Sequence, residues 1–234
     1  MQPNRFFKLP LAYDPDKLLA DLQTCLAAHW TDHYNKPCYQ GDWNSISLRS
    51  ASGNSEDIHT FSVSKTFQDT DLLNSCMYFR EILDGLDCDK ETARLLRLTP
   101  GSVIHEHRDL GVHYLRGNFR IHIPITTDEG VRFIVDGSEL PMKTGECWYA
   151  DFDLPHSVRH DGINDRIHLI IDCLRNKWSD ALFARAGYDF ESEARLKEPD
   201  RATKLLMLQQ LTAIPGEGAR KLAEKLSREL GDGI

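Results

Sequence analysis

One short segment of the chain concentrates side chains that can bind metals or move protons. The stretch GSVIHEHRDLGVHYLRGNFRIHIPI, residues 101–125, contains four histidines among residues that otherwise alternate as in a β-strand. Side chains two positions apart on a strand share a face, so an extended VIHEHRD would present His105, His107 and Asp109 on one side. His107 and Asp109 could therefore offer one imidazole and one carboxylate to a single ion.

A third ligand must come from elsewhere, and the best candidate is His156 in DFDLPHSVRHDG, at the start of a later predicted strand. Two histidines and one carboxylate form a facial triad, which binds Fe(II) and leaves coordination positions open. A structural zinc site would tend to close with four protein ligands, often cysteines, and no cysteine lies at a useful spacing. An isolated His-x-Asp pair is more often a surface feature, and a His105–His107 pair is an alternative to the set with Asp109.

Arginines within apolar strands support the metal-centre hypothesis. Arg166 opens the strand RIHLIIDCL, ten residues after His156. Burying an unpaired charge is costly, whereas arginine can bind a carboxylate with two hydrogen bonds, so an arginine beside an open metal centre suggests a bound dicarboxylate. Arg120 and His122 share one face of FRIHIPI, which is either a polar barrel interior or a solvent-exposed outer face.

The elements around these residues predict a β-rich core. From about residue 92 the chain runs through short β-rich segments separated by Gly, Pro, Asp and Asn turns, as is typical of an antiparallel sandwich or barrel. Residues 43–49 alternate as a further strand should. We expect His113 and His160 to lie on the surface of this core.

Helices are predicted on both sides of the core. Residues 14–30 should form a helix with Asp14 as its N-cap and Pro15 in its first turn, and residues 70–86 should form another. Towards the C-terminus, KWSDALFARAG is a candidate helix. A polar stretch, DFESEARLKEPD, then leads to two amphipathic candidates, RATKLLMLQQLTAI and GARKLAEKLSREL.

This pattern divides the chain into two parts. Residues 1–175 would form the core domain with its N-terminal helices, and residues 176–234 a helical C-terminal extension. The extension either packs on the core or acts as a lid or dimer arm, and the sequence does not separate these alternatives.

Composition excludes several other classes of protein. The 234 residues are 41% hydrophobic and 27% charged, as in ordinary globular proteins, and the formal net charge of −8 offers no basic face for nucleic acid. No apolar run is long enough to span a bilayer, and the N-terminal MQPNRFFKLPLAYDPD has no apolar signal-peptide core. Six scattered cysteines without a CxxC motif argue against a disulfide scaffold. We therefore expect a reduced, cytoplasmic protein with no membrane partner.

Taken in order, the segments HRD, FRIHIPI and GECWYADFDLPHSVRHDGINDRIHLIIDC resemble the aspartyl/asparaginyl β-hydroxylase family, over roughly residues 40–175. They look most like its bacterial branch, which includes free-amino-acid hydroxylases such as the proline cis-hydroxylases. The resemblance implies a mainly β fold with flanking helices, built on a double-stranded β-helix (a jelly-roll, cupin-like core). It also implies an Fe(II)- and 2-oxoglutarate-dependent dioxygenase, which uses O2 to hydroxylate an unactivated C–H bond while 2-oxoglutarate is converted to succinate and CO2.

The resemblance also assigns roles to individual residues. Arg166 would bind the distal carboxylate of 2-oxoglutarate, and Arg120 and His122 match an Arg-x-His pair that approaches the cosubstrate in the mammalian members. Those members lack the carboxylate ligand that this chain has, which places the chain with the bacterial amino-acid hydroxylases. The implied iron ligands, which are also the implied catalytic residues, are His107, Asp109 and His156.

The substrate is less constrained than the metal centre. Arg94 in TARLLRL could bind a substrate carboxylate and Trp43 could form an apolar wall, with Arg116 as a weaker candidate, although ordinary packing or surface exposure would also explain these residues. A free amino acid or amino-acid derivative is the favoured substrate, and an Asp or Asn residue within a peptide or protein is the alternative. A closed pocket would favour the former and a long groove the latter.

Three further expectations complete the prediction. Ascorbate is expected to stimulate the activity. The C-terminal helices could also join two copies of the chain in a homodimer. A catalytically silent cupin-like binding module and a zinc hydrolase are the competing classes, but the first leaves the metal-ligand set without a purpose and the second leaves Arg166 unexplained.

Overall fold

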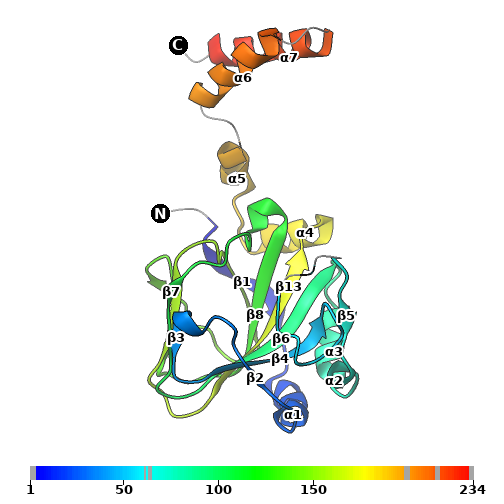
Figure 1. Ribbon diagram of the computed structural model, residues 1–234, viewed down its shortest axis with the longest axis vertical. Coiled ribbons are helices and arrows are strands. Elements are labelled where there is room, and N and C mark those ends of the chain that lie inside the picture. The colour runs from blue at the N-terminus through cyan, green and yellow to red at the C-terminus, as the bar shows by residue number, and fades with distance from the viewer. Residues whose placement is uncertain (1–3, 61, 63–64, 198–200, 214–216, 232–234) are drawn as a thin grey trace. The chain divides into compact units, whose positions relative to one another are not determined.

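The computed structural model of the chain divides into two compact units, Met1–Tyr188 and Asp189–Ile234. The first unit is a sandwich of two antiparallel sheets that face each other across a common apolar core (Figure 1). This is the mainly β architecture with flanking helices that the sequence predicts. The residues that the structure describes are 4–60, 62, 65–197, 201–213 and 217–231.

The larger sheet has eight strands in the order β1-β11-β8-β13-β6-β4-β2, with β5 paired to β4. Its centre is formed by the long strands β8, β13 and β6, which later supply the charged residues of the site. The bounds of its strands are β1 Phe6–Ala12, β2 Thr31–Asp32, β4 Trp43–Ser50, β5 Gln68–Asp69, β6 Lys90–Leu98, β8 Asn118–Thr126, β11 Glu146–Ala150 and β13 Arg166–Leu174.

The smaller sheet has five strands in the order β10-β9-β12-β7-β3. Residues of both sheets alternate between the core and the outer face, so that Leu96 and Ile170 of the larger sheet meet Ile104, Phe133 and Val158 of the smaller one. The bounds of its strands are β3 Tyr39–Gln40, β7 Val103–His107, β9 Val131–Val135, β10 Ser138–Glu139 and β12 His156–His160, and two short 3-10 helices are η1 Lys36–Cys38 and η2 Tyr114–Arg116.

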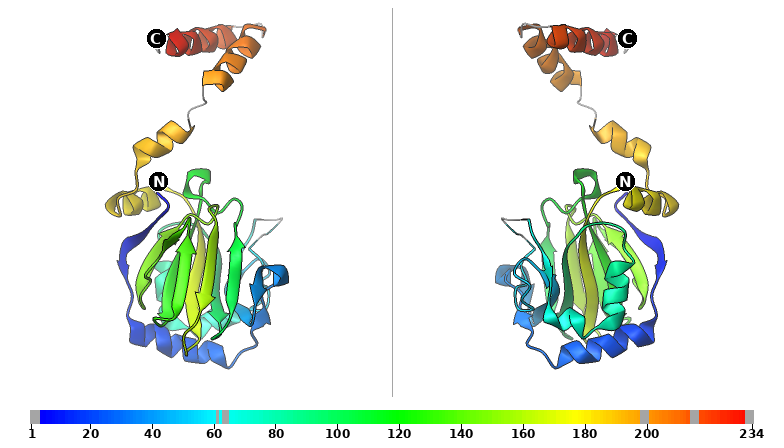
Figure 2. Two further views of the ribbon diagram at one scale, coloured as in Figure 1. Left: turned by 90° about the vertical axis from the view of Figure 1, so that its left-hand side faces the viewer. Right: turned by 90° about the vertical axis from the view of Figure 1, so that its right-hand side faces the viewer.

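Helix α1 begins as predicted but ends earlier. The side chain of Asp14 accepts hydrogen bonds from the first turn, which confirms it as the N-cap, and the helix crosses one end of the sheets (Figure 2). It ends at Leu26 because the carbonyl of Cys25 accepts hydrogen bonds from the backbone of Ala28 and the indole of Trp30. The helices of the first unit are α1 Pro15–Leu26, α2 Asp71–Asn74, α3 Met77–Asp84 and α4 Lys177–Arg185.

The helix predicted over residues 70–86 is interrupted. Thr70 caps α2, and the carboxylate of Asp21 in α1 accepts hydrogen bonds of 2.8 Å from the backbone N–H groups of Tyr78 and Phe79. A side chain from another helix therefore caps the start of α3, and this long-range contact breaks the helix into two.

The first strand was not predicted from the sequence. The strand β1 has the sequence FFKLPLA, pairs with β11 and lies at the edge of the larger sheet. Pro10 can be accommodated there because a backbone donor is not needed on the open side.

The prediction that His160 lies on the surface is wrong. His160 is buried, and its ring bonds the carbonyl of Asn164 and the backbone N–H of Gly162. His113 is partly exposed.

The division between the two units lies later in the chain than the predicted boundary at residues 175 and 176. Helix α4 belongs to the first unit because Phe183 stacks on Tyr114 with ring centroids 3.8 Å apart and contacts Phe7 and Tyr149. Whether the remaining helices pack on the core or act as a lid or dimer arm stays a prediction.

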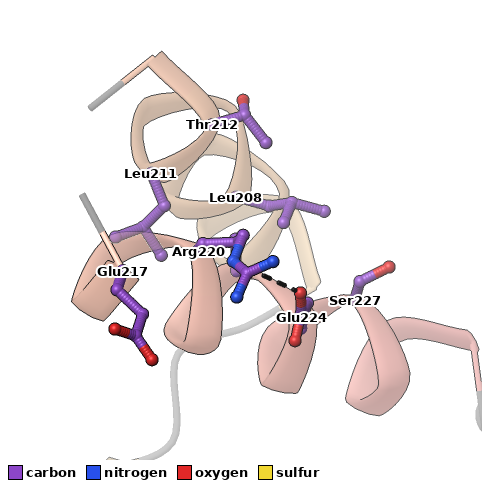
Figure 3. Close-up of a pocket in the computed structure, with 8 residues that line it drawn as sticks. Leu208, Leu211, Thr212, Glu217, Arg220, Glu224 and Ser227 are labelled. Carbon is purple, nitrogen blue, oxygen red and sulfur yellow. Dashed lines mark ion pairs between the residues drawn. The ribbon is translucent and has the colours of Figure 1, made fainter. Parts of the chain in front are cut away.

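In its described residues, the second unit contains three helices. Much of the predicted polar stretch DFESEARLKEPD is helical, with Asp189 accepting a hydrogen bond from the backbone of Ser192 in the first turn. A groove of about 920 Å³ lies between the last two helices, where Arg220 and Glu224 form an ion pair of 4.0 Å (Figure 3). The helices are α5 Phe190–Lys197, α6 Arg201–Ala213 and α7 Glu217–Gly231.

No helix in the described ranges combines the length and apolar character that crossing a membrane requires.

Candidate metal centre

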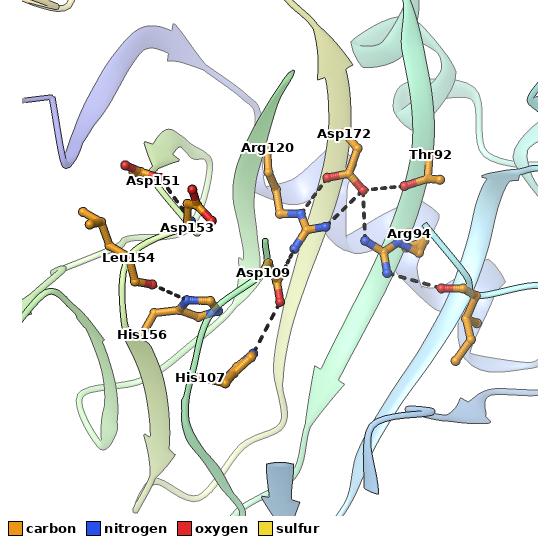
Figure 4. A network of polar contacts seen from close by, with 11 residues as sticks. Thr92, Arg94, His107, Asp109, Arg120, Asp151, Asp153, Leu154, His156 and Asp172 are labelled. Atoms are coloured by element: carbon orange, nitrogen blue, oxygen red, sulfur yellow. Dashed lines mark hydrogen bonds and ion pairs between the residues drawn. The ribbon is translucent and has the colours of Figure 1, made fainter. Parts of the chain in front are cut away.

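The structure brings His107, Asp109 and His156 together between the two sheets (Figure 4). One ligand atom from each lies within 4.8 Å of the others, and the Nε2 atom of His107 is 3.7 Å from the Oδ1 atom of Asp109. His107 and His156 are opposite each other in the pairing of β7 with β12, so their ring centroids are only 4.2 Å apart. Among the described residues, this is the one group of three metal-binding side chains at such distances.

Backbone carbonyls fix the orientation of both imidazoles. The Nδ1 atom of His107 lies 2.8 Å from the carbonyl oxygen of His105, and the Nδ1 atom of His156 lies 3.0 Å from that of Leu154. A carbonyl can only accept, so each Nδ1 carries the proton and each Nε2 presents a lone pair, the form that binds a metal. His105 is exposed and contributes its backbone here, so the structure does not form the alternative His105–His107 ligand pair.

Asp109 lies just beyond the end of β7 rather than within an extended VIHEHRD strand. Its backbone N–H donates to the carbonyl of Phe152 at 2.8 Å, and its Oδ2 accepts a very short hydrogen bond from the Nη1 atom of Arg120. Burial by itself would raise the pKa of this carboxyl, but Arg120 and the two histidines outweigh burial and lower it. Asp109 is therefore ionised, as a metal ligand must be.

Burial also keeps His156 in its metal-binding form. The side chain is buried, and this lowers the pKa of its imidazole to about 4. The ring therefore remains neutral throughout the physiological pH range, with its Nε2 lone pair available.

A buried ion network supports Asp109 from the larger sheet. Arg120 donates to the Oδ1 atom of Asp172 from Nε at 2.6 Å, and Asp172 Oδ2 also accepts from Arg94 at 3.0 Å and from Thr92 at 2.6 Å (Figure 4). Burial would raise the pKa of Asp172, but the two arginines outweigh burial and lower it. Asp172 therefore bonds to both arginines and fixes Arg120, which in turn holds Asp109.

Sequence reasoning missed Asp172 and Thr92. The signal was present in RIHLIIDCL, because the alternation that directs Arg166 inwards also directs His168 and Asp172 inwards. The prediction that Arg120 contacts the cosubstrate stays a prediction, since its hydrogen bonds in this structure go to the two aspartates.

Arg166 is the one buried arginine without a carboxylate partner in the part of the chain that the structure describes. It is 2% exposed, and unlike Arg94 and Arg120 it forms no ion pair within the described part of the chain. Its Nη2 lies 3.0 Å from the Nδ1 atom of His168, while its Nε is buried with no hydrogen-bond partner among the described residues. Burial lowers the pKa of the guanidinium to about 9, so it is still charged at neutral pH.

Two cavities meet at the candidate ligands. A small one of about 40 Å³ is bordered by the three ligands together with His122 and Arg166, and the buried Nε2 atom of His122 has no partner in the described structure. A larger one of about 350 Å³ borders His107 and Asp109 and is lined by Arg94 and Trp43. His33 stacks on Trp43 at 3.5 Å between ring centroids and extends this wall.

Of the residues that the sequence suggests for substrate binding, two border the larger cavity and one does not. Arg94 and Trp43 border the larger cavity and are 2% and 6% exposed, respectively. Arg116 lies outside both linings, with a mostly exposed side chain paired to Asp153 at 3.3 Å. The surface alternative for Arg120 and His122 is wrong, because both are buried within the sandwich.

Two facing antiparallel sheets with a His/Asp/His centre and a buried arginine opposite it define the class of double-stranded β-helix, metal-binding oxygenase folds. Solved structures with this fold confirm the predicted jelly-roll. An oxidoreductase of the 2OG-Fe(II) oxygenase family from Burkholderia pseudomallei is 16% identical, with a TM-score of 0.51, over 74% of this chain and 86% of that one. HygX from Streptomyces hygroscopicus, with nickel and 2-oxoglutarate bound, is 10% identical, with a TM-score of 0.50, over 74% and 84%.

Within this class, the chain belongs to the aspartyl/asparaginyl β-hydroxylase family, whose model matches residues 15–176. It is also similar to the L-proline cis-4-hydroxylase of Rhizobium meliloti (strain 1021), with 28% identity over 166 residues. That match covers 68% of this chain but 57% of the relative, so the chain corresponds to less than two thirds of the relative's length. The family predicted from the sequence is confirmed.

Proposed function

We propose that this protein is an Fe(II)- and 2-oxoglutarate-dependent dioxygenase that hydroxylates an unactivated C–H bond of a free amino acid or amino-acid derivative. The main observation is the pairing of two features across one small cavity. His107, Asp109 and His156 lie on one side, and Arg166, a buried cation without a carboxylate among the described residues, lies on the other.

The residues present fit Fe(II). They supply two imidazoles and one ionised carboxylate, within 4.8 Å of one another, and all three belong to β7, β12 and the loop after β7. Cosubstrate and substrate would bind in the two cavities that border these residues. Fe(II) and 2-oxoglutarate, when bound, supply the oxidising power that inserts an oxygen atom of O2 into a C–H bond.

The protein's own residues provide binding, orientation and shielding from water. Arg166 would bind the distal carboxylate of 2-oxoglutarate with two hydrogen bonds, which compensates its charge on binding. His122 borders the same cavity and would contact the cosubstrate through its free Nε2. Arg120 holds Asp109, and through Asp172 this orientation is tied to the centre of the larger sheet.

The larger cavity supports a small carboxylate-bearing substrate. Its volume of about 350 Å³ is near the lower limit for small-molecule sites. Arg94 is buried at its border and shares its one carboxylate partner in the described structure, Asp172, with Arg120, so positive charge remains for an anionic group. Trp43, backed by His33, would form the apolar wall beside the carbon atoms of the substrate.

A cytoplasmic, homodimeric enzyme is part of the proposal. All six cysteines are free, including Cys25 and Cys76, whose sulfur atoms lie 3.5 Å apart, as expected in a reducing compartment. Helix α6 leaves Leu205 and Leu206 50% and 61% exposed, and Leu222 of α7 is 50% exposed. Such an apolar surface on a helical unit is suited to association with a second copy.

Succinate formation tests the function. The purified protein would be incubated with Fe(II), ascorbate and 2-oxoglutarate against a panel of free L-amino acids and short Asp- or Asn-containing peptides. We expect stimulation by a free amino acid, together with a product heavier by one oxygen atom in mass spectrometry. Omitting ascorbate should lower the yield, because it keeps iron reduced.

The matched controls come from neighbouring histidines. His107→Ala and Asp109→Ala should abolish turnover, whereas His105→Ala should retain it, because His105 contributes a backbone carbonyl and not its ring. Turnover with peptides alone would keep the chemistry and replace the substrate class. Full activity of the His107→Ala or Asp109→Ala variant would refute the proposed centre, and failure to bind iron would favour a silent binding module.

A further inference from the structure

The one histidine of β13, His168, contacts Arg166 directly. His168 is 2% exposed and follows Arg166 by two residues, so both side chains project to the inner face of the larger sheet. The Nη2 atom of Arg166 lies 3.0 Å from the Nδ1 atom of His168. Because a guanidinium only donates, the Nδ1 atom of His168 must accept, and the proton of this neutral ring is on Nε2.

The neutral character of this acceptor distinguishes it from the partners of the other buried arginines. Arg94 and Arg120 share the carboxylate of Asp172, and Arg120 also pairs with Asp109, so part of their positive charge is compensated within the protein. His168 instead accepts one of the five hydrogens of Arg166 and leaves its full positive charge in place. The Nε hydrogen of Arg166 has no partner among the described residues, so an anion can bind while the contact to His168 persists.

Neighbouring rings hold this pair in position. The guanidinium of Arg166 lies over the ring of Phe133, 5.5 Å from its centroid, and the Nδ1 atom of His122 lies 3.4 Å from that of His168. Both Phe133 and His122 border the same small cavity as Arg166. Phe133, His122 and Arg166 therefore form part of the wall of this cavity, and His168 contacts that wall through Arg166 and His122.

We infer that His168 is a positioning residue, which orients Arg166 for the distal carboxylate of 2-oxoglutarate without neutralising it. This inference rests on the proposed function. His168 acts on the ligand only through Arg166. It should therefore affect the affinity for 2-oxo acids that carry a distal carboxylate and not the affinity for those that lack one.

An isosteric pair of variants separates hydrogen bonding from charge. His168→Asn keeps an acceptor near the Nδ1 position, whereas His168→Asp keeps the acceptor and adds a negative charge. Binding of 2-oxoglutarate to the nickel-loaded protein would be measured by isothermal titration calorimetry, which needs no turnover. We expect His168→Asn to bind within about threefold of the wild type, and His168→Asp to bind at least about tenfold more weakly, because a buried carboxylate would compensate Arg166.

A second ligand shows whether the effect passes through Arg166. His168→Leu removes the acceptor and should weaken 2-oxoglutarate by about tenfold, the order expected for a hydrogen bond to a charged group. Binding of 2-oxobutyrate, which lacks the distal carboxylate, should not change. In an Arg166→Met background, His168→Leu should cause no further loss. His160→Leu removes a buried histidine that borders neither cavity at the ligands, and it should leave the ratio of the two affinities unchanged.

The outcomes separate the role of His168 from the proposed function. Equal weakening of both ligands by His168→Leu would show that His168 only packs. Tighter binding of 2-oxoglutarate by this variant would show that the anion must displace His168, which also overturns the inference. If the nickel-loaded wild type binds no 2-oxoglutarate, the proposed function itself fails, and the role of His168 fails with it.

Discussion

Replacing Arg166 with methionine should make the protein more stable and unable to use 2-oxoglutarate. Methionine retains the length of the side chain but removes a buried charge that has no carboxylate partner among the described residues. Buried ionic groups are often replaced by apolar ones at no cost in stability, whereas binding sites keep such groups for function. The Arg166→Met variant should therefore unfold less readily than the wild type while it binds 2-oxoglutarate more weakly.

The magnitude follows from three contributions. Burial lowers the pKa of Arg166 from its ordinary value to about 9, which corresponds to a penalty on the order of 4–5 kcal/mol in the folded protein at neutral pH. The hydrogen bond to His168 offsets about 1.5–3 kcal/mol, and the contact with the Phe133 ring about 1–2 kcal/mol. The Arg166→Met variant should therefore gain about 1 kcal/mol, or roughly 2–4 °C in Tm.

The pH dependence has a defined sign. Because the folded pKa lies below the unfolded one, the unfolded state binds more protons between about pH 9 and 12.5, and this group's contribution to stability increases with pH across that window. Below pH 9 the penalty is present in full. The Arg166→Met variant should lack this increase.

Urea unfolding with and without 2-oxoglutarate checks these expectations. At a hundred times its Kd, 2-oxoglutarate should stabilise the nickel-loaded wild type by about 2.7 kcal/mol and should not stabilise Arg166→Met at the same concentration. Arg159→Met is the matched control, since Arg159 is 64% exposed and its pair with Asp161 should change stability by less than about 0.5 kcal/mol. A loss of more than about 1 kcal/mol in Arg166→Met, or unchanged stabilisation by 2-oxoglutarate, would refute the reasoning.

Three further perturbations follow from the same structure. Asp172→Asn should lower the free energy of unfolding by about 3–5 kcal/mol in urea titrations, because it leaves Arg94 without a carboxylate partner among the described residues and Arg120 with Asp109 alone. Burial would raise the pKa of Asp172, but its arginines outweigh burial, so the pKa in the folded protein is lowered. The contribution of Asp172 to stability should therefore be full above about pH 4 and should decline as the pH falls through the folded pKa. Equal acid sensitivity of the wild type and Asp172→Asn would contradict this. Trp43→Ala should enlarge the cavity of about 350 Å³ and lower the free energy of unfolding by about 3–5 kcal/mol. The variant should accept bulkier amino acids in the succinate assay, and an unchanged substrate profile would contradict the role of Trp43 in the cavity wall. Leu206→Glu should shift the mass measured by analytical ultracentrifugation from dimer to monomer, and a wild-type monomer would exclude the proposed association.

The sequence was sufficient to predict the family and to single out the three candidate ligands that the structure brings together. The spacing of His107 and Asp109, the later His156 and the arginine ten residues beyond it are local features. They depend on the alternation of side chains along a strand, which the sequence specifies directly. The mainly β core was predictable for the same reason.

Elements that depend on distant partners were predicted poorly. Strand β1 was missed because its pairing with β11 joins residues far apart in the chain. The helix over residues 70–86 was predicted as continuous, because nothing in that segment indicates that Asp21 of another helix caps α3. Such contacts override local propensity, and only the folded chain contains them.

The charge state of the site was decided by tertiary structure alone. In the sequence, Arg94, Arg120 and Arg166 are arginines on three predicted strands, and nothing there shows which of them has a carboxylate partner. Folding places Asp172 between the first two and gives Arg166 a neutral histidine instead. Compensation of a buried charge depends on distances of a few ångströms across adjacent strands, and those distances exist only once β6, β8 and β13 have paired.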